Sequence, residues 1–161
     1  MIAAEASSES PLWADALLPP ACREVEPVFS PLGDARYALG LETIYEGYLL
    51  HYGRPRLFAP AGRHTSLLLG DYLYAHGLVR VASHQDVDAV ADLAALISLC
   101  AQFRADGSPG DGAAWAATAA LLGTGPLFET HDPTELADAA RAAGGADSVE
   151  RALVAHRRRV G

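Results

Sequence analysis

The chain contains no lysine, and what it lacks excludes several kinds of protein. Its twelve basic residues are all arginines. Its formal net charge is −8, and this acidic charge disfavours nucleic acid as a partner. Two cysteines, Cys22 and Cys100, are too few for a disulfide framework. No apolar run is long enough to span a bilayer, and the first ten residues are polar and acidic, unlike a secretory signal. We therefore expect a cytoplasmic protein without a transmembrane segment.

The composition predicts one folded domain preceded by an arm. The chain has 161 residues, of which 50% are hydrophobic and 20% charged, enough to bury a core. Residues 1–33 contain five prolines between Pro11 and Pro31, and prolines this dense interrupt helices and ladders. We expect an extended N-terminal arm over 1–33, with a helical turn or two near Leu12–Leu18, and a single helical domain over 34–161.

The remaining sequence predicts an all-α bundle of about five to six helices. Apolar residues recur at helical spacing, and no segment alternates with the period of a strand. Asp34 and Asp132 are predicted N-caps, and GSPGDG at 107–112 is a loop. The predicted helices span 34–52, 63–83, 85–106, 113–122, 133–143 and 147–159.

Two of these predicted helices, 63–83 and 85–106, are apolar around much of their circumference. Such helices lie in a bundle interior or at a subunit interface. Because the chain is too short to cover both, we expect an oligomer, formed with itself or with another protein.

No complete active-site motif is present. His51, His64, Asp71, His76 and His84 lie in or beside two helices, but no Glu-x-x-His occurs, so we expect no metal. Neither Gly-rich loop has the ending of a phosphate loop, and no base lies near Cys100 in the sequence. We expect no cofactor. Three arginines lie around the loop before the helix that begins at residue 63: Arg54, Arg56 and Arg63. They could hold a diphosphate near the helix N-terminus, or they could be solvated loop arginines.

One stretch resembles a known family. His51-Tyr52-Gly53-Arg54-Pro55-Arg56 leads into a helix containing Gly70-Asp71-Tyr72-Leu73. This order is similar to the polyprenyl (trans-isoprenyl diphosphate) synthases, in which an aspartate-rich helix and an arginine loop precede a Gly-Asp-Tyr-Leu helix. The resemblance covers roughly residues 34–105. It implies helices that line a prenyl tunnel and a dimer contact.

The departures from this family concern catalysis. Both aspartate-rich motifs that bind Mg²⁺ and diphosphate in the family are missing, and Glu42 and Glu46 are two isolated carboxylates. The resemblance therefore implies a short, non-catalytic subunit beside a catalytic partner. The residues expected to line the tunnel or interface are Tyr48, Leu69, Gly70, Asp71, Tyr72, Leu73 and His76. Asp71 is expected to be a buried carboxylate with a partner such as an arginine or a helix N-terminus.

Three hypotheses follow for the function. The first is this accessory subunit of a heteromeric polyprenyl diphosphate synthase, not catalytic alone. The second is a helical adaptor or assembly subunit of an unrelated enzyme complex. The third is a binder of a lipophilic isoprenoid or quinone.

Overall fold

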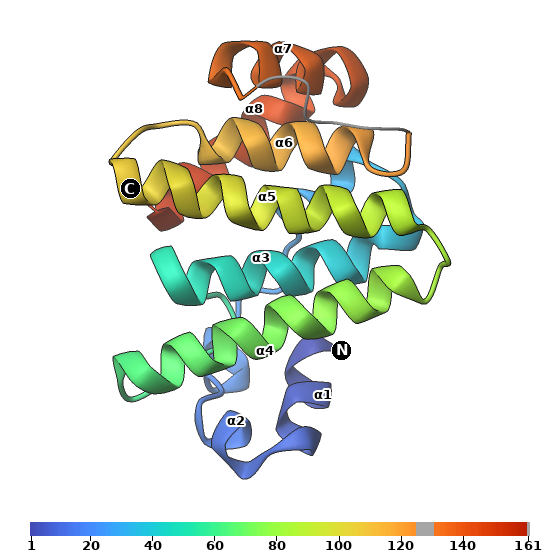
Figure 1. Ribbon diagram of the computed structural model, residues 1–161. Coiled ribbons are helices and arrows are strands. Elements are labelled where there is room, and N and C mark those ends of the chain that lie inside the picture. The colour runs from blue at the N-terminus through green and yellow to red at the C-terminus, as the bar shows by residue number, and fades with distance from the viewer. Residues whose placement is uncertain (125–130, 161) are drawn as a thin grey trace.

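The structure is a computed structural model that describes residues 1–124 and 131–160 (Figure 1). This part of the chain holds eight α-helices and no β-strand, apart from an isolated bridge between Leu17 and Phe58. The predicted all-α class is thus confirmed for these residues. The α-helices are α1 (Ile2–Glu9), α2 (Pro11–Asp15), α3 (Ala38–Tyr52), α4 (Arg63–Ala82), α5 (Val87–Asp106), α6 (Asp111–Leu121), α7 (Pro133–Gly144) and α8 (Ala146–Val160).

The N-terminal segment differs from the extended arm that the sequence predicted. Residues 2–15 form α1 and α2, and Ser10 caps α2 by accepting a hydrogen bond from the backbone N–H of Leu12. The prolines do not prevent this, because Pro11 stands at the first position of α2, where no N–H is needed. These two helices add to the six of α3–α8.

The helices stack in layers in Figure 1, with α7 at one end, α1 and α2 at the other, and α3 to α6 between them. The main core lies among α3, α5, α6, α7 and α8. Its aromatic centre joins Tyr45 and Tyr48 of α3 to Trp115 of α6 at ring centroid distances of 5.0 and 5.6 Å. Phe29 stacks on the same indole. The residues that precede α3 are therefore part of the core.

Glycines bring α3 and α4 into close contact. A Cβ on Gly47 would lie 2.9 Å from the carbonyl oxygen of Gly70, and a Cβ on Gly77 would lie 2.9 Å from that of Gly40. Both distances are shorter than real Cβ contacts allow, so the two backbones meet without side chains between them at these points. Gly70, half of the Gly-Asp pair noted in the sequence, has this packing role.

A second, smaller core lies between α4 and the N-terminal helices. Leu69 and Leu73 of α4 are buried there with Phe58 and Ala6. Trp13 of α2 packs on Tyr72, with 5.7 Å between ring centroids. The N-terminal segment thus covers one flank of α4.

Candidate functional site

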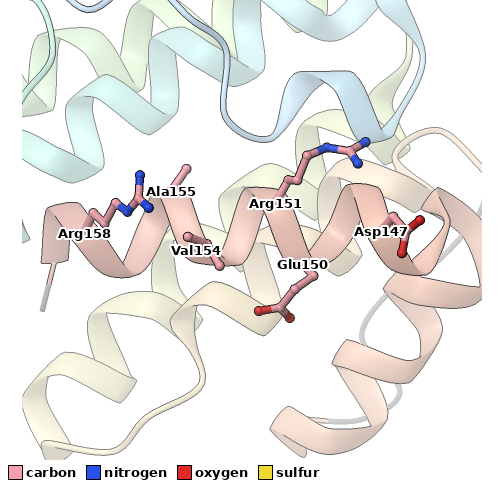
Figure 2. Close-up of a pocket in the computed structure, with 6 residues that line it drawn as sticks. All are labelled: Asp147, Glu150, Arg151, Val154, Ala155 and Arg158. Carbon is pink, nitrogen blue, oxygen red and sulfur yellow. The ribbon is translucent and has the colours of Figure 1, made fainter.

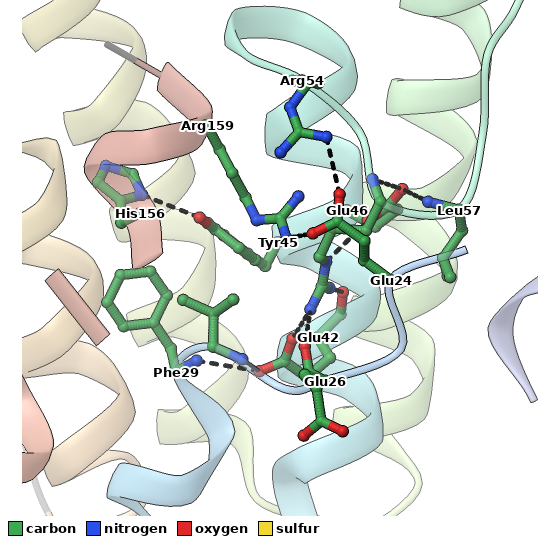
Figure 3. Close-up of polar contacts among 12 residues, drawn as sticks. Glu24, Glu26, Phe29, Glu42, Tyr45, Glu46, Arg54, Leu57, His156 and Arg159 are labelled. Atoms are coloured by element: carbon green, nitrogen blue, oxygen red, sulfur yellow. Dashed lines mark hydrogen bonds and ion pairs between the residues drawn. The ribbon is translucent and has the colours of Figure 1, made fainter. Parts of the chain in front are cut away.

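Glu42 and Glu46, labelled in Figure 3, form a buried ion-pair network with Arg56. The guanidinium of Arg56 donates to Oε2 of Glu42 at 2.6 Å and to Oε2 of Glu46 at 3.0 Å. Burial disfavours the charge on Arg56, but the two carboxylates outweigh it and raise the pKa of Arg56. The two glutamates that looked isolated in the sequence are thus partners of one arginine.

Backbone groups complete this network. Oε1 of Glu42 accepts the backbone N–H groups of Val28, Phe29 and Ser30 at 2.9–3.0 Å. Oε1 of Glu46 accepts those of Arg56 and Leu57 at 2.8 Å. Each carboxylate therefore ties a loop to α3, and buried charges satisfied in this way act as structural links.

The three arginines considered for a diphosphate have different surroundings. Arg56 is 3% exposed and holds Glu42 and Glu46. Arg54 donates to Glu24 at 2.7 Å, and Arg159 of α8 binds the same carboxylate. Hydrogen bonds from these two arginines lower the pKa of Glu24. Arg63 is exposed at the start of α4. Thus two of the three arginines have carboxylate partners within the chain.

A second polar network crosses the main core. Asp111, at the start of α6, accepts hydrogen bonds from Tyr48 and, at 2.5 Å, from Arg104, and it lies 3.3 Å from Nε2 of His156. Nδ1 of that imidazole is 3.0 Å from the hydroxyl of Tyr45. Burial favours the neutral form of Asp111, but hydrogen bonds from His156 and Tyr48 and the charge of Arg104 hold its pKa well below the usual value. The network joins α3, α5, α6 and α8.

The second network was missed by sequence reasoning, which placed Tyr48 at a tunnel or interface. Tyr48 is 1% exposed and lies inside the bundle. Burial is the first cause of the raised pKa of its phenol, and the hydrogen bond to Asp111 is the second. No local motif signals this contact, because Tyr48 and Asp111 are 63 residues apart.

The other residues expected at a tunnel or interface mostly face the chain itself. Leu69, Gly70 and Leu73 are buried, and Tyr72 lies against Trp13. His76 is partly buried and stacks on Tyr72 with 5.3 Å between ring centroids. These residues meet α3 and the N-terminal segment. The exposed residues of α4 lie on the opposite side of the helix from these contacts.

Asp71 is exposed, whereas the sequence predicted a buried carboxylate. Its side chain is 69% exposed, and its partner is Nε2 of His51 at 3.1 Å, where an arginine or a helix N-terminus was expected. Burial lowers the pKa of His51 despite this carboxylate. Because Gly70 faces α3, the next residue in the helix points outward, which places Asp71 at the surface.

Between Leu68 and Ala82 on α4 and between Ala91 and Ser98 on α5, Asp71 is the one charged residue among the exposed ones. Leu68 and Val79 of α4 are 58% and 66% exposed. The exposed residues of α5 between Ala91 and Ser98 are small and uncharged. Helices that face water normally present charged side chains. The residues of these outer stripes are Leu68, Asp71, Ala75, Val79 and Ala82 on α4, and Ala91, Ala94, Ala95 and Ser98 on α5.

The outer side of α8 is charged by contrast (Figure 2). A shallow hollow of about 490 Å³ lies over it. Asp147, Glu150, Arg151 and Arg158 line the hollow together with Val154 and Ala155. Balanced charges on one helix side are typical of a solvated surface, so the outer stripes of α4 and α5 are the stronger candidate interface.

The described residues contain no group of three or more His, Cys, Asp and Glu side chains placed to hold a metal ion. None of the described helices combines the length and apolar character of a membrane crossing. Comparisons with protein families, with curated proteins and with solved structures found no match to this chain.

Proposed function

We propose that this chain is a non-catalytic helical subunit that associates with a catalytic partner through the outer stripes of α4 and α5. The observation that carries the proposal is the near absence of charge on these exposed stripes, in a chain whose net charge is −8. Exposed apolar surface of this kind marks protein interfaces. The small residues of the α5 stripe, Ala91, Ala94, Ala95 and Ser98, would also allow a partner helix to approach closely.

The partner proposed is a catalytic polyprenyl diphosphate synthase subunit that carries the aspartate-rich motifs. The resemblance over residues 34–105 supports this choice. The internal pairing of Arg56 with Glu42 and Glu46 is consistent with a subunit that leaves diphosphate chemistry to its partner. In such an assembly this chain contributes a wall, and the partner contributes the Mg²⁺ and diphosphate site.

Co-expression with such a partner from the same genome tests the proposal. We expect a stable complex with prenyl-transfer activity that neither chain shows alone. Val79→Asp and Ala94→Asp each place a charge on a stripe, and burying an unpaired charge should weaken the complex about 100-fold, measured by sedimentation. Ala142→Asp, on the exposed side of α7, is the matched control and should leave the complex intact.

Other outcomes would replace this proposal. A partner that is fully active without this chain, together with no complex, would overturn it. Stable association with an enzyme of another class, lost in the same two stripe variants, would establish the adaptor hypothesis instead.

A further inference from the structure

A pocket of about 550 Å³ lies beneath the first turn of α1, away from the outer stripes of α4 and α5. Ile2 and Ala3 of α1 line one side, and Leu39 of α3 and Leu57 line another. Val25 and Pro27, in the segment before α3, also line it. This volume and this apolar wall are typical of a small-molecule site.

The charged side chains that line the pocket already have partners within the chain. They are two arginines, Arg23 and Arg56, and two glutamates, Glu24 and Glu42. Arg56 and Glu42 bind each other, and Nε of Arg23 donates to the carbonyl oxygen of Leu18 at 2.7 Å. Glu24 is held by Arg54 and Arg159. A charged ligand would therefore lose hydration and would have to displace one of these contacts to gain a counter-charge.

A small polar area remains beside the apolar wall. Ser30 lines the pocket next to Glu42 and Arg56, and its backbone N–H is already held by Glu42. A hydroxyl or carbonyl group is the ligand end that fits such an area, because it forms hydrogen bonds without bringing a net charge.

The first turn of α1 lines one side of this pocket, and few contacts hold α1 in place. Glu5 of α1 forms an ion pair with Arg80 of α4 and lies 3.8 Å from Nε2 of His76. Ala6 is buried in the smaller core. These few contacts hold a helix of eight residues, so its opening costs less than unfolding of the bundle.

We propose that this pocket binds a small, uncharged lipophilic molecule with one hydroxyl or carbonyl end, and that α1 closes over it. The site is separate from the proposed subunit interface. A bound ligand therefore stabilises the N-terminal segment whether or not the chain has a partner.

Three ligands of equal chain length test the proposal by calorimetric titration of the full chain: decanol, decanoate and decyltrimethylammonium. We expect decanol to bind at one site and the two charged compounds to bind at least about tenfold more weakly. Decanol should also slow hydrogen exchange of residues 2–9. Equal binding of all three, or no binding of decanol, would overturn the proposal.

Blocking variants locate the binding. Ala3→Trp and Leu39→Trp fill the pocket from opposite sides, and each should weaken decanol binding at least about tenfold. Ala142→Trp on α7 is the matched control and should bind like the unmodified chain. Decanol binding that persists in both folded blocking variants would place it elsewhere and overturn the proposal. Loss of the subunit complex with decanol binding retained would count against the proposed function alone.

Discussion

The helix pair α4–α5 and the helix pair α7–α8 differ in the residues that they expose on their outer sides. In α7 and α8 one side is buried through Leu136, Ala140 and Val149, while charged residues occupy the other. Ion pairs such as Arg141–Asp138 at 2.9 Å lie on that outer side. On α4 and α5 the exposed residues between Leu68 and Ala82 and between Ala91 and Ser98 are apolar or small, apart from Asp71. The outer side of α7–α8 is therefore typical of a surface that faces water, and the exposed apolar residues of α4–α5 are typical of a protein interface.

Arg56→Met has the largest expected effect, because Arg56 and its two glutamates hold the neighbouring loops onto α3. The substitution leaves Glu42 and Glu46 buried without their cation, so the free energy of unfolding should fall by about 3–5 kcal/mol. Denaturant titration measures it. Arg158→Met, an exposed arginine on α8, is the control and should change it by less than about 0.5 kcal/mol. A small loss of unfolding free energy in Arg56→Met would show that the ion pairs do not hold these loops onto α3.

Gly77→Val tests the close contact of α3 and α4. The added side chain meets Ile44 and the carbonyl oxygen of Gly40, and overpacking of this kind should cost about 1–3 kcal/mol of unfolding free energy. Gly62→Ala, just before α4, is the control, because a Cβ there meets nothing within 4 Å. Equal stability of the two variants would mean that α4 can shift away from α3 without cost.

Asp111→Asn tests whether α8 is joined to the core by the buried network or by its surface charges. Since the folded-state pKa of Asp111 is lowered, its contribution is present above the unfolded-state pKa and is lost as pH falls through the folded-state pKa. We expect a loss of about 2 kcal/mol at neutral pH. The difference from the unmodified chain should shrink as pH falls below about 4. A difference independent of pH down to the acid limit would contradict this role.

Val79→Asp has the smallest expected effect on the isolated chain. Val79 is 66% exposed, so its replacement should change the unfolding free energy by less than about 0.5 kcal/mol. The same change should reduce self-association at high concentration, measured by light scattering, because it adds charge to an apolar stripe. Val154→Asp on α8 should leave self-association unchanged. A large loss of stability at Val79 would instead indicate that this residue belongs to the core.

The helices after residue 37 follow from local signals in the sequence. Asp132 was predicted to cap a helix that begins at Pro133, and it accepts the N–H groups of Thr134 and Glu135 there. The helix predicted over 63–83 is α4, Arg63–Ala82. Of the N-terminal helices, α2 overlaps the helical turn predicted near Leu12–Leu18. The α1 helix was not predicted, because the packing of Ile2–Glu9 depends on distant residues of α4.

The candidate site followed from the sequence only in part. The apolar character of the segments that form α4 and α5 predicted an interface, but the periodicity did not show which side each residue would occupy. The side taken by α4 is decided by its glycines, since Gly70 and Gly77 must face α3. The buried networks could not be predicted, because they join residues such as Tyr45 and His156, which are 111 positions apart.

The glycine contact between α3 and α4 also determines how mutations are tolerated along α4. At Gly70 and Gly77 a Cβ would collide with a neighbouring backbone or side chain. Ala75 and Val79 are exposed, so the isolated chain should accept large and polar residues there. A saturation scan of α4 scored for folding should thus oscillate with a period of 3.6 residues. The same scan scored for partner binding should gain a second set of sensitive positions, half a turn out of phase.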